Sequence, residues 1–144
     1  MIDAYQKLFT HIDKDLFFKS SIEDIIFIED KLIEENWQAL KSKLENNEIV
    51  SIRGYGRDAK GTDLYKSLYR HLLNNDNIIK DATNNAAPTK LLKELTPFCK
   101  VTEDGKNGKI KIVNFQISHL FGKTKNPFLF CSPWNIAYIP KYLD

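Results

Sequence analysis

The chain has 144 residues, of which 42% are hydrophobic and 28% are charged, and its net charge is +2. These values are typical of a globular protein and exclude an intrinsically disordered chain, and the length suits one ordinary core. No stretch approaches the roughly 20 apolar residues of a membrane helix, and the N-terminus lacks the pattern of a signal peptide. We therefore expect a soluble, cytoplasmic protein with no membrane contact.

The charge is unevenly distributed along the chain. Residues 1–48 carry 6 Lys and Arg against 11 Asp and Glu, whereas residues 87–144 carry 9 against 4. The basic part is a candidate phosphate-binding surface, and solvated lysine-rich loops are the alternative. No repeat or proline-rich linker divides the chain, so we expect one compact unit over residues 1–144.

The N-terminal part, residues 1–47, reads as helical and acidic. Helical spacing of apolar residues predicts a short helix over 3–18. A capping-box pattern at Ser20-Ser21-Ile22-Glu23 then predicts a long helix over 22–46, with an apolar stripe and an acidic face. A solvated face explains these carboxylates better than a metal site does, because lysines alternate with them.

A mixed α/β part, residues 48–113, begins with a strand over 48–53 and a glycine-rich loop over 54–62. Gly56 and Gly61 have the spacing of a P-loop, but Thr62 follows Gly61 directly without the lysine, which argues against ATP or NAD binding. The loop can still grip a nucleic-acid phosphate through three cations, and a surface loop without a ligand is equally compatible with the pattern. These cations are Arg53, Arg57 and Lys60.

The same part continues with helices and a predicted β-hairpin. Periodicity predicts a helix over 63–74, with Leu64, Leu68 and Leu72 on its apolar stripe, a short segment around 78–82, and a proline-started helix over 88–96. A hairpin over 98–103 and 109–117 would follow, turning at 104–108. This order resembles a winged helix, which implies DNA contacts from a recognition helix and a wing, and an unrelated α+β hairpin is the alternative. The residues concerned are Lys90, Lys93, Lys106 and Lys109.

The C-terminal part, residues 114–144, reads as a strand, a basic loop and a helix. Apolar and polar residues alternate up to His119, which places His119 on the apolar face of the strand. Gly122 and the pair Asn126-Pro127 predict a turn, and Ser132-Pro133 predicts the start of a helix. Asn135 would then lie in the first turn of that helix.

This arrangement resembles the His-Me finger, or ββα-metal, endonucleases, on the residues Ser118-His119, Asn126-Pro127 and Trp134-Asn135. The resemblance implies that His119 is the general base and that Asn135, with Ser118 nearby, holds Mg²⁺ or another divalent ion. It makes Asn126 a loop-shaping or site residue. The loop lysines Lys123 and Lys125 would face the phosphate backbone. No second histidine follows Asn135, so the motif either uses few ligands or is truncated.

The sequence thus predicts an α+β fold and, by resemblance, a metal-dependent DNA endonuclease of restriction or defence type. A winged-helix-like DNA-binding module without enzymatic activity is the first alternative. A protein-interaction domain that uses exposed Trp134, Tyr138 and Tyr142 is the second. The expected partner is DNA, and a homodimer is left open. Cys99 and Cys131 match no metal spacing and are expected to be reduced thiols.

Overall fold

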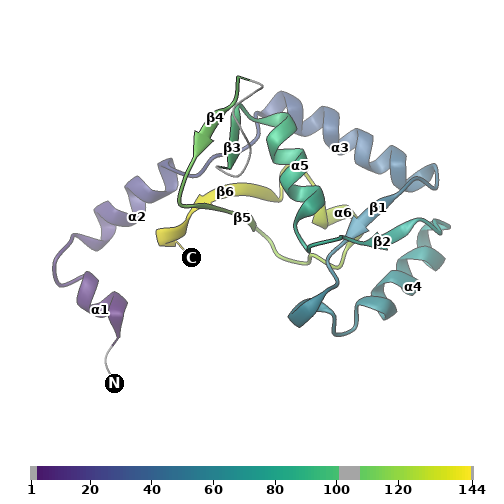
Figure 1. Cartoon of the computed structure of the whole chain (residues 1–144), viewed down its shortest axis with the longest axis horizontal. Helices are drawn as coiled ribbons and strands as arrows, with labels where there is room; N and C mark the ends of the chain where they lie inside the picture. The colour runs from purple at the N-terminus through teal and green to yellow at the C-terminus, as the bar shows by residue number, and fades with distance from the viewer. Residues whose placement is uncertain (1–2, 101–107, 144) are drawn as a thin grey trace.

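A computed structural model describes residues 3–100 and 108–143 and has an α+β fold (Figure 1). Its elements, in chain order, are α1 (Ala4–Leu8), α2 (Lys14–Glu23), α3 (Asp30–Glu45), β1 (Val50–Ile52), η1 (Gly56–Asp58), α4 (Thr62–Leu73), β2 (Ile78–Lys80), α5 (Ala86–Leu95), β3 (Phe98–Lys100), β4 (Ile110–Ile112), β5 (Phe115–His119), α6 (Pro127–Phe130), β6 (Ile136–Pro140) and η2 (Lys141–Leu143).

The strands form three two-stranded sheets in the described part of the chain. β1 and β2 pair in parallel, with Val50 opposite Ile78, and α4 is the crossover between them. β3 and β4 also pair in parallel, whereas β5 and β6 pair antiparallel, with His119 opposite Ile136. None of the described helices is long and apolar enough to cross a membrane.

The N-terminal prediction needs correction. Two helices were expected, over 3–18 and 22–46, but the described part of this region has three, α1, α2 and α3, with different bounds. α2 continues to Glu23, and α3 begins only at Asp30. Between them the chain is extended, and Ile26 makes a bridge to Tyr138 of β6, exchanging hydrogen bonds of 3.0 and 3.1 Å. Burial of Ile28 in the core favours this extended segment over a continuous helix. α1 and α2 project from the rest of the molecule (Figure 1).

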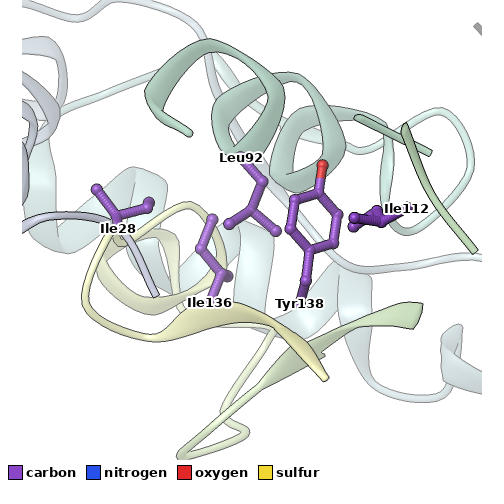
Figure 2. Packing of buried hydrophobic residues seen from close by; sticks show 5 residues of the cluster. All are labelled: Ile28, Leu92, Ile112, Ile136 and Tyr138. Carbon is purple, nitrogen blue, oxygen red and sulfur yellow. The ribbon is translucent and has the colours of Figure 1, made fainter. Parts of the chain in front are cut away.

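The main core lies between α5 and β6. Figure 2 shows Leu92 of α5, Ile136 and Tyr138 of β6, Ile112 of β4 and the interhelical Ile28 packed side by side. Leu92 and Tyr138 are both 0% exposed. A second cluster joins α3 to β1 through Leu40, Leu44 and Val50. Burial of these side chains is the main force that holds the short strands in place.

The apolar stripe predicted for the 63–74 helix does not face the core. α4 spans nearly the predicted residues, but Leu64, Leu68 and Leu72 are 73%, 45% and 63% exposed. α4 packs against β2, and Thr62, its first residue, is buried. The helix therefore turns a face other than the leucine stripe toward the core. Periodicity identified the helix correctly but not its buried side.

The winged-helix interpretation is wrong in its hairpin. β3 and β4 pair in parallel, with Phe98 opposite Ile110, and a hairpin would pair antiparallel. β4 is short, and the chain beyond it enters a separate sheet as β5. Most of the predicted turn over 104–108, including Lys106, lies outside the described residues.

The C-terminal helix prediction is also wrong. Ser132 and Pro133 lie in a turn, and the following residues Ile136–Pro140 form β6, which pairs with β5 over five residues. The helix of this region is α6, which begins at Pro127 with Asn126 as its N-cap. Because Ile136, Ala137 and Tyr138 are all buried, pairing with β5 satisfies their backbone groups inside the core.

Candidate nucleic-acid interface

The loops that follow β1 and β2 meet at the carboxyl ends of these strands. Because the two strands are parallel, Arg53 and Asp81 follow them at the same edge, and the Asp81 amide donates a 2.8 Å hydrogen bond to the Ile52 carbonyl. Ligands of parallel sheets commonly bind at this edge. Asp81 is 2% exposed, and its carboxylate accepts from the Ala86 and Ala87 amides at the start of α5.

A single asparagine holds the loop that follows β1. The Asn84 side-chain oxygen accepts from the Gly54 and Tyr55 amides at 3.0 and 2.8 Å, and its nitrogen donates to the Tyr55 carbonyl at 2.9 Å. Gly54 is packed so closely that a Cβ there would lie 2.4 Å from Cγ2 of Thr62. The loop therefore has a defined conformation over its first residues.

The loop before α6 joins the same surface. The Arg53 amide donates a 2.9 Å hydrogen bond to the Thr124 carbonyl, and the Lys125 ammonium donates to the Lys60 carbonyl. The structure thus brings together two basic segments, 53–60 and 123–125, that are about 65 residues apart in sequence. Five of the predicted DNA-binding residues lie on them: Arg53, Arg57, Lys60, Lys123 and Lys125.

This surface, which we call the loop surface, consists of residues 53–65, 80–84 and 122–126. Its charge is only partly compensated. Arg53 pairs with Asp58 at 2.8 Å, and Lys80 pairs with Asp63 at 3.0 Å. Six cations, the five above and Lys80, face three carboxylates, those of Asp58, Asp63 and Asp81. A net positive surface of this kind attracts phosphate groups.

Two exposed tyrosines lie among these cations. Tyr55 is 48% exposed, and the Lys80 ammonium is 5.9 Å from the centre of its ring. Tyr65, in the first turns of α4, is 44% exposed, and the Lys125 ammonium is 6.0 Å from its ring centre. The loop surface therefore combines half-exposed aromatic rings with cations that lie over them.

His119 lies at the end of β5 with its ring stacked on Phe130 at 5.3 Å between centroids. Its Nε2 is 2.9 Å from the Phe130 carbonyl oxygen, which can only accept, so Nε2 carries hydrogen and Nδ1 keeps the lone pair of the neutral ring. Burial lowers the pKa of His119, the Phe130 hydrogen bond raises it, and the positive charge of Arg53 lowers it, with a net lowering. Neutral imidazole is thus favoured.

The predicted metal ligands do not form a site. Asn135 is 0% exposed, its side-chain oxygen accepts from the Phe121 amide at 2.8 Å, and its nitrogen donates to the Gly122 and Leu129 carbonyls. Ser118 neighbours His119 on β5 and so faces the other side of the strand. Among the described residues there is no group of three His, Cys, Asp or Glu that could hold an ion.

Asn135 and Asn126 instead have structural positions. The Asn135 amide connects the 121–122 turn to α6, and the Asn126 side chain accepts from the Phe128 amide at 2.8 Å as the N-cap of α6. Both asparagines hold the basic loop in place through hydrogen bonds within the protein. The loop-shaping role predicted for Asn126 fits this N-cap geometry, whereas the bonded side chain of Asn135 does not fit the metal-ligand role that the resemblance implied.

Three cations of the predicted recognition helix and wing, Lys90, Lys93 and Lys109, lie elsewhere in the described part of the chain. Lys90 is 3.9 Å from Glu94 in a groove beside α3, whereas Lys93 lines a groove on the β3 side of α5. The Lys109 ammonium donates a 2.6 Å hydrogen bond to the Thr96 carbonyl at the end of α5. These lysines do not form one surface with the loop cations.

The three aromatic residues proposed for protein interaction also lie in different places and do not form one exposed surface. Tyr138 is 0% exposed in the core, which corrects the expectation that it is exposed. Trp134 packs edge-on against Trp37 at 5.7 Å between ring centroids, while Tyr142 is 48% exposed beside α2. Cys99 and Cys131 are both free thiols, and burial raises the pKa of Cys131 to about 12.

Sequence reasoning missed Lys80, Asp81 and Asn84 as parts of the loop surface. A signal was present, since a strand, a helix and a second apolar segment follow one another over 48–82. Such a unit predicts parallel strands whose following loops meet at one edge. The polar residues after the second strand were therefore candidates for contact with the glycine-rich loop.

Comparison with known proteins places the chain in a family. Residues 28–144 match the family model described as "Uncharacterised protein PM1201". A relative from Pasteurella multocida (strain Pm70), "Uncharacterized protein PM1201", is 42% identical over 145 residues. This match covers 99% of the present chain, which spans 62% of the relative's length. No solved structure matches significantly. The chain therefore belongs to the PM1201 family.

Proposed function

We propose that this chain is a nucleic-acid-binding domain that grips the phosphate backbone with the loop surface. The observation that carries the proposal is the joining of the two basic segments by the Arg53–Thr124 and Lys125–Lys60 contacts. Cations that are distant in sequence thereby lie on one surface and could contact the same nucleic acid. Arg57, Lys60 and Lys123 are exposed, so their charges can reach phosphate oxygens.

Phosphate binding by such a surface is favoured by counterion release and by a fixed loop. Each phosphate neutralised by Lys or Arg releases condensed cations, so affinity falls steeply as the salt concentration rises. The Asn84 hydrogen bonds and the tight packing of Gly54 hold the first part of the loop before any ligand binds. A preformed loop loses less conformational entropy on binding than a loose one.

Fluorescence anisotropy with labelled oligonucleotides at two salt concentrations tests the proposal. The double variant Lys60→Glu/Lys125→Glu reverses two charges of the loop surface, and we expect it to weaken binding at least tenfold, about 1.4 kcal/mol. The matched control Lys7→Glu/Lys19→Glu reverses two exposed charges on α1 and α2, and we expect it to have little effect. Equal losses in both double variants, or no salt-dependent binding by the wild type, would contradict the proposal.

A metal-dependent DNA endonuclease of restriction or defence type is the second candidate, and His119 is the observation that favours it. The Phe130 carbonyl orients the ring, leaving a lone pair on Nδ1, and the lowered pKa keeps the ring neutral, as a general base requires. The charge of Arg53 acts on the same ring. Mg²⁺ or another divalent ion belongs to this candidate, although Asn135 and Ser118 do not supply its ligands.

Plasmid nicking with Mg²⁺ or Mn²⁺ tests this second candidate. Cleavage that needs the metal and is lost in His119→Ala would support it, provided that His71→Ala, at an exposed position of α4, still cleaves. Cleavage that survives in His119→Ala would assign the activity to other residues. Salt-sensitive binding without cleavage would leave the binding domain as the function.

A further inference from the structure

We propose that the loop surface takes unpaired nucleotides of DNA or RNA, with bases stacked on Tyr55 and Tyr65 and phosphates held by the adjacent cations. This inference rests on the proposed function and narrows its substrate class. Both rings are close to half exposed and belong to the same loop and helix start as the cations. Neither ring belongs to the hydrophobic core clusters.

The backbone positions of both tyrosines are held before a ligand arrives. The amide and the carbonyl of Tyr55 are both bonded to the Asn84 side chain, at 2.8 and 2.9 Å. The Tyr65 amide donates a 3.1 Å hydrogen bond to the Gly61 carbonyl in the first turn of α4. A stacked base would therefore fix only side-chain torsions, and the conformational entropy lost on binding is small.

Each ring also has its own cation. The Lys80 and Lys125 ammonium groups lie over the rings, 5.9 and 6.0 Å from the two ring centres, so a base would stack on the opposite face of each ring with a cation nearby. Lys80 is oriented by Asp63, and Lys125 by the Lys60 carbonyl. The pairing of an aromatic ring with a cation thus occurs twice on the loop surface, and surfaces that bind single strands combine these two features.

A duplex would use only part of this surface. In double-stranded DNA the base faces are stacked on one another, and a protein meets base edges and phosphates. The tyrosine faces would then have no base to cover them, and binding would depend on the cations alone. Single strands expose base faces that stack on aromatic side chains with little sequence preference.

Anisotropy with a labelled 20-nucleotide DNA strand, the matching RNA strand and a 20-base-pair DNA duplex tests the inference. The variants Tyr55→Leu and Tyr65→Leu remove an aromatic face and keep apolar bulk. We expect each to weaken single-strand binding by roughly fivefold or more, the lower end of base stacking energies, and to leave duplex binding unchanged. Tyr5→Leu, at a position that is 55% exposed on α1, is the matched control and is expected to bind like the wild type.

The outcomes separate this inference from the proposed function. The inference is supported if the wild type binds the DNA strand or the RNA strand more tightly than the duplex, and if both tyrosine variants lose single-strand affinity. The strand that binds more tightly identifies the preferred sugar. Equal binding of duplex and single strands that only Lys60→Glu/Lys125→Glu weakens overturns the inference and leaves the proposed function standing. No binding of any of the three probes overturns both.

Discussion

The amide of Arg53 donates a 2.9 Å hydrogen bond to the carbonyl of Thr124, and this contact joins the end of β1 to the loop before α6. The two residues are 71 positions apart in sequence. This bond holds the segment 123–125 against the loop that follows β1. Lys123 and Lys125 therefore lie beside that loop. The segments of the loop surface keep their relative positions only if the residues beneath them are closely packed. Substitutions at these residues test that packing.

Gly54→Ala should destabilise the protein through a steric clash. The added Cβ would lie 2.4 Å from Cγ2 of Thr62, which is buried, so the backbone of the loop has to shift. Overpacking of this kind costs about 1–3 kcal/mol of unfolding free energy, measurable by urea denaturation. In the background Thr62→Ser, which lacks Cγ2 but keeps the hydroxyl bonded to the Asp58 carbonyl, the same substitution should cost clearly less. Equal costs in both backgrounds would show that the clash is not the cause.

Asn135→Ala should reduce stability by the same amount with and without magnesium. The substitution leaves the Phe121 amide and the Leu129 carbonyl, whose bonds to Asn135 are partly buried, without their side-chain partner, at a cost of roughly 1–3 kcal/mol. For a chain of this size the melting temperature should fall by about 2–4 °C for each kcal/mol. Differential scanning calorimetry with Mg²⁺ and with a chelator measures both conditions. A Mg²⁺-induced rise in the wild-type melting temperature that the variant lacks would instead support a metal-ligand role.

His119 should make the protein less stable at mildly acidic pH. The folded state lowers the pKa of His119 through burial, so the unfolded chain binds the proton more tightly. Its contribution is fully present above the unfolded pKa of about 6.5 and is lost as the pH falls through the folded value. Urea denaturation at pH 7.5 and 5.5 should show this loss, and it should be smaller in His119→Gln. An NMR titration of His119 with a midpoint at or above 6.5 would contradict the assignment.

The NMR titration of His119 also tests whether the charge of Arg53, on the loop surface, acts on the imidazole. Arg53→Gln removes a positive charge that lowers the pKa of His119, so the midpoint of His119 should rise in this variant. Arg57→Gln, at a neighbouring exposed position, serves as the control for a general loss of loop charge. A larger rise in Arg57→Gln than in Arg53→Gln would mean that the imidazole responds to the surface as a whole.

Leu92→Ala and Leu64→Ala should differ in cost although the chemical change is the same. Leu92 is 0% exposed between α5 and β6, and its truncation should leave a cavity and cost about 2–5 kcal/mol. Leu64 is 73% exposed on α4, and its truncation should change the unfolding free energy by less than about 0.5 kcal/mol. Urea denaturation measures both. A large loss in Leu64→Ala would show that the leucine face of α4 is covered in solution.

Local sequence signals predicted several elements closely. The helix predicted over 63–74 is α4 over Thr62–Leu73, the helix predicted over 88–96 is α5 over Ala86–Leu95, and the strand predicted over 48–53 contains β1. The α+β class and the strand that ends at His119 were also correct. Helical periodicity, proline near a helix start and a β-branched run act over a few residues, so the sequence can show them directly.

Tertiary structure decided the rest, as the C-terminal region illustrates. Ser132-Pro133 has the local pattern of a helix start, yet Ile136–Pro140 form a strand, because β5 supplies hydrogen-bond partners and α5 and Ile28 bury the side chains. The leucines of α4 are exposed because β2 packs on another face of that helix. The sequence by itself determined the helices α4 and α5, the strand β1 and the basic character of the loops. Which face is buried, which strands pair and which loops meet depend on contacts between residues that are distant in the chain, and periodicity within one segment carries no information about its partner.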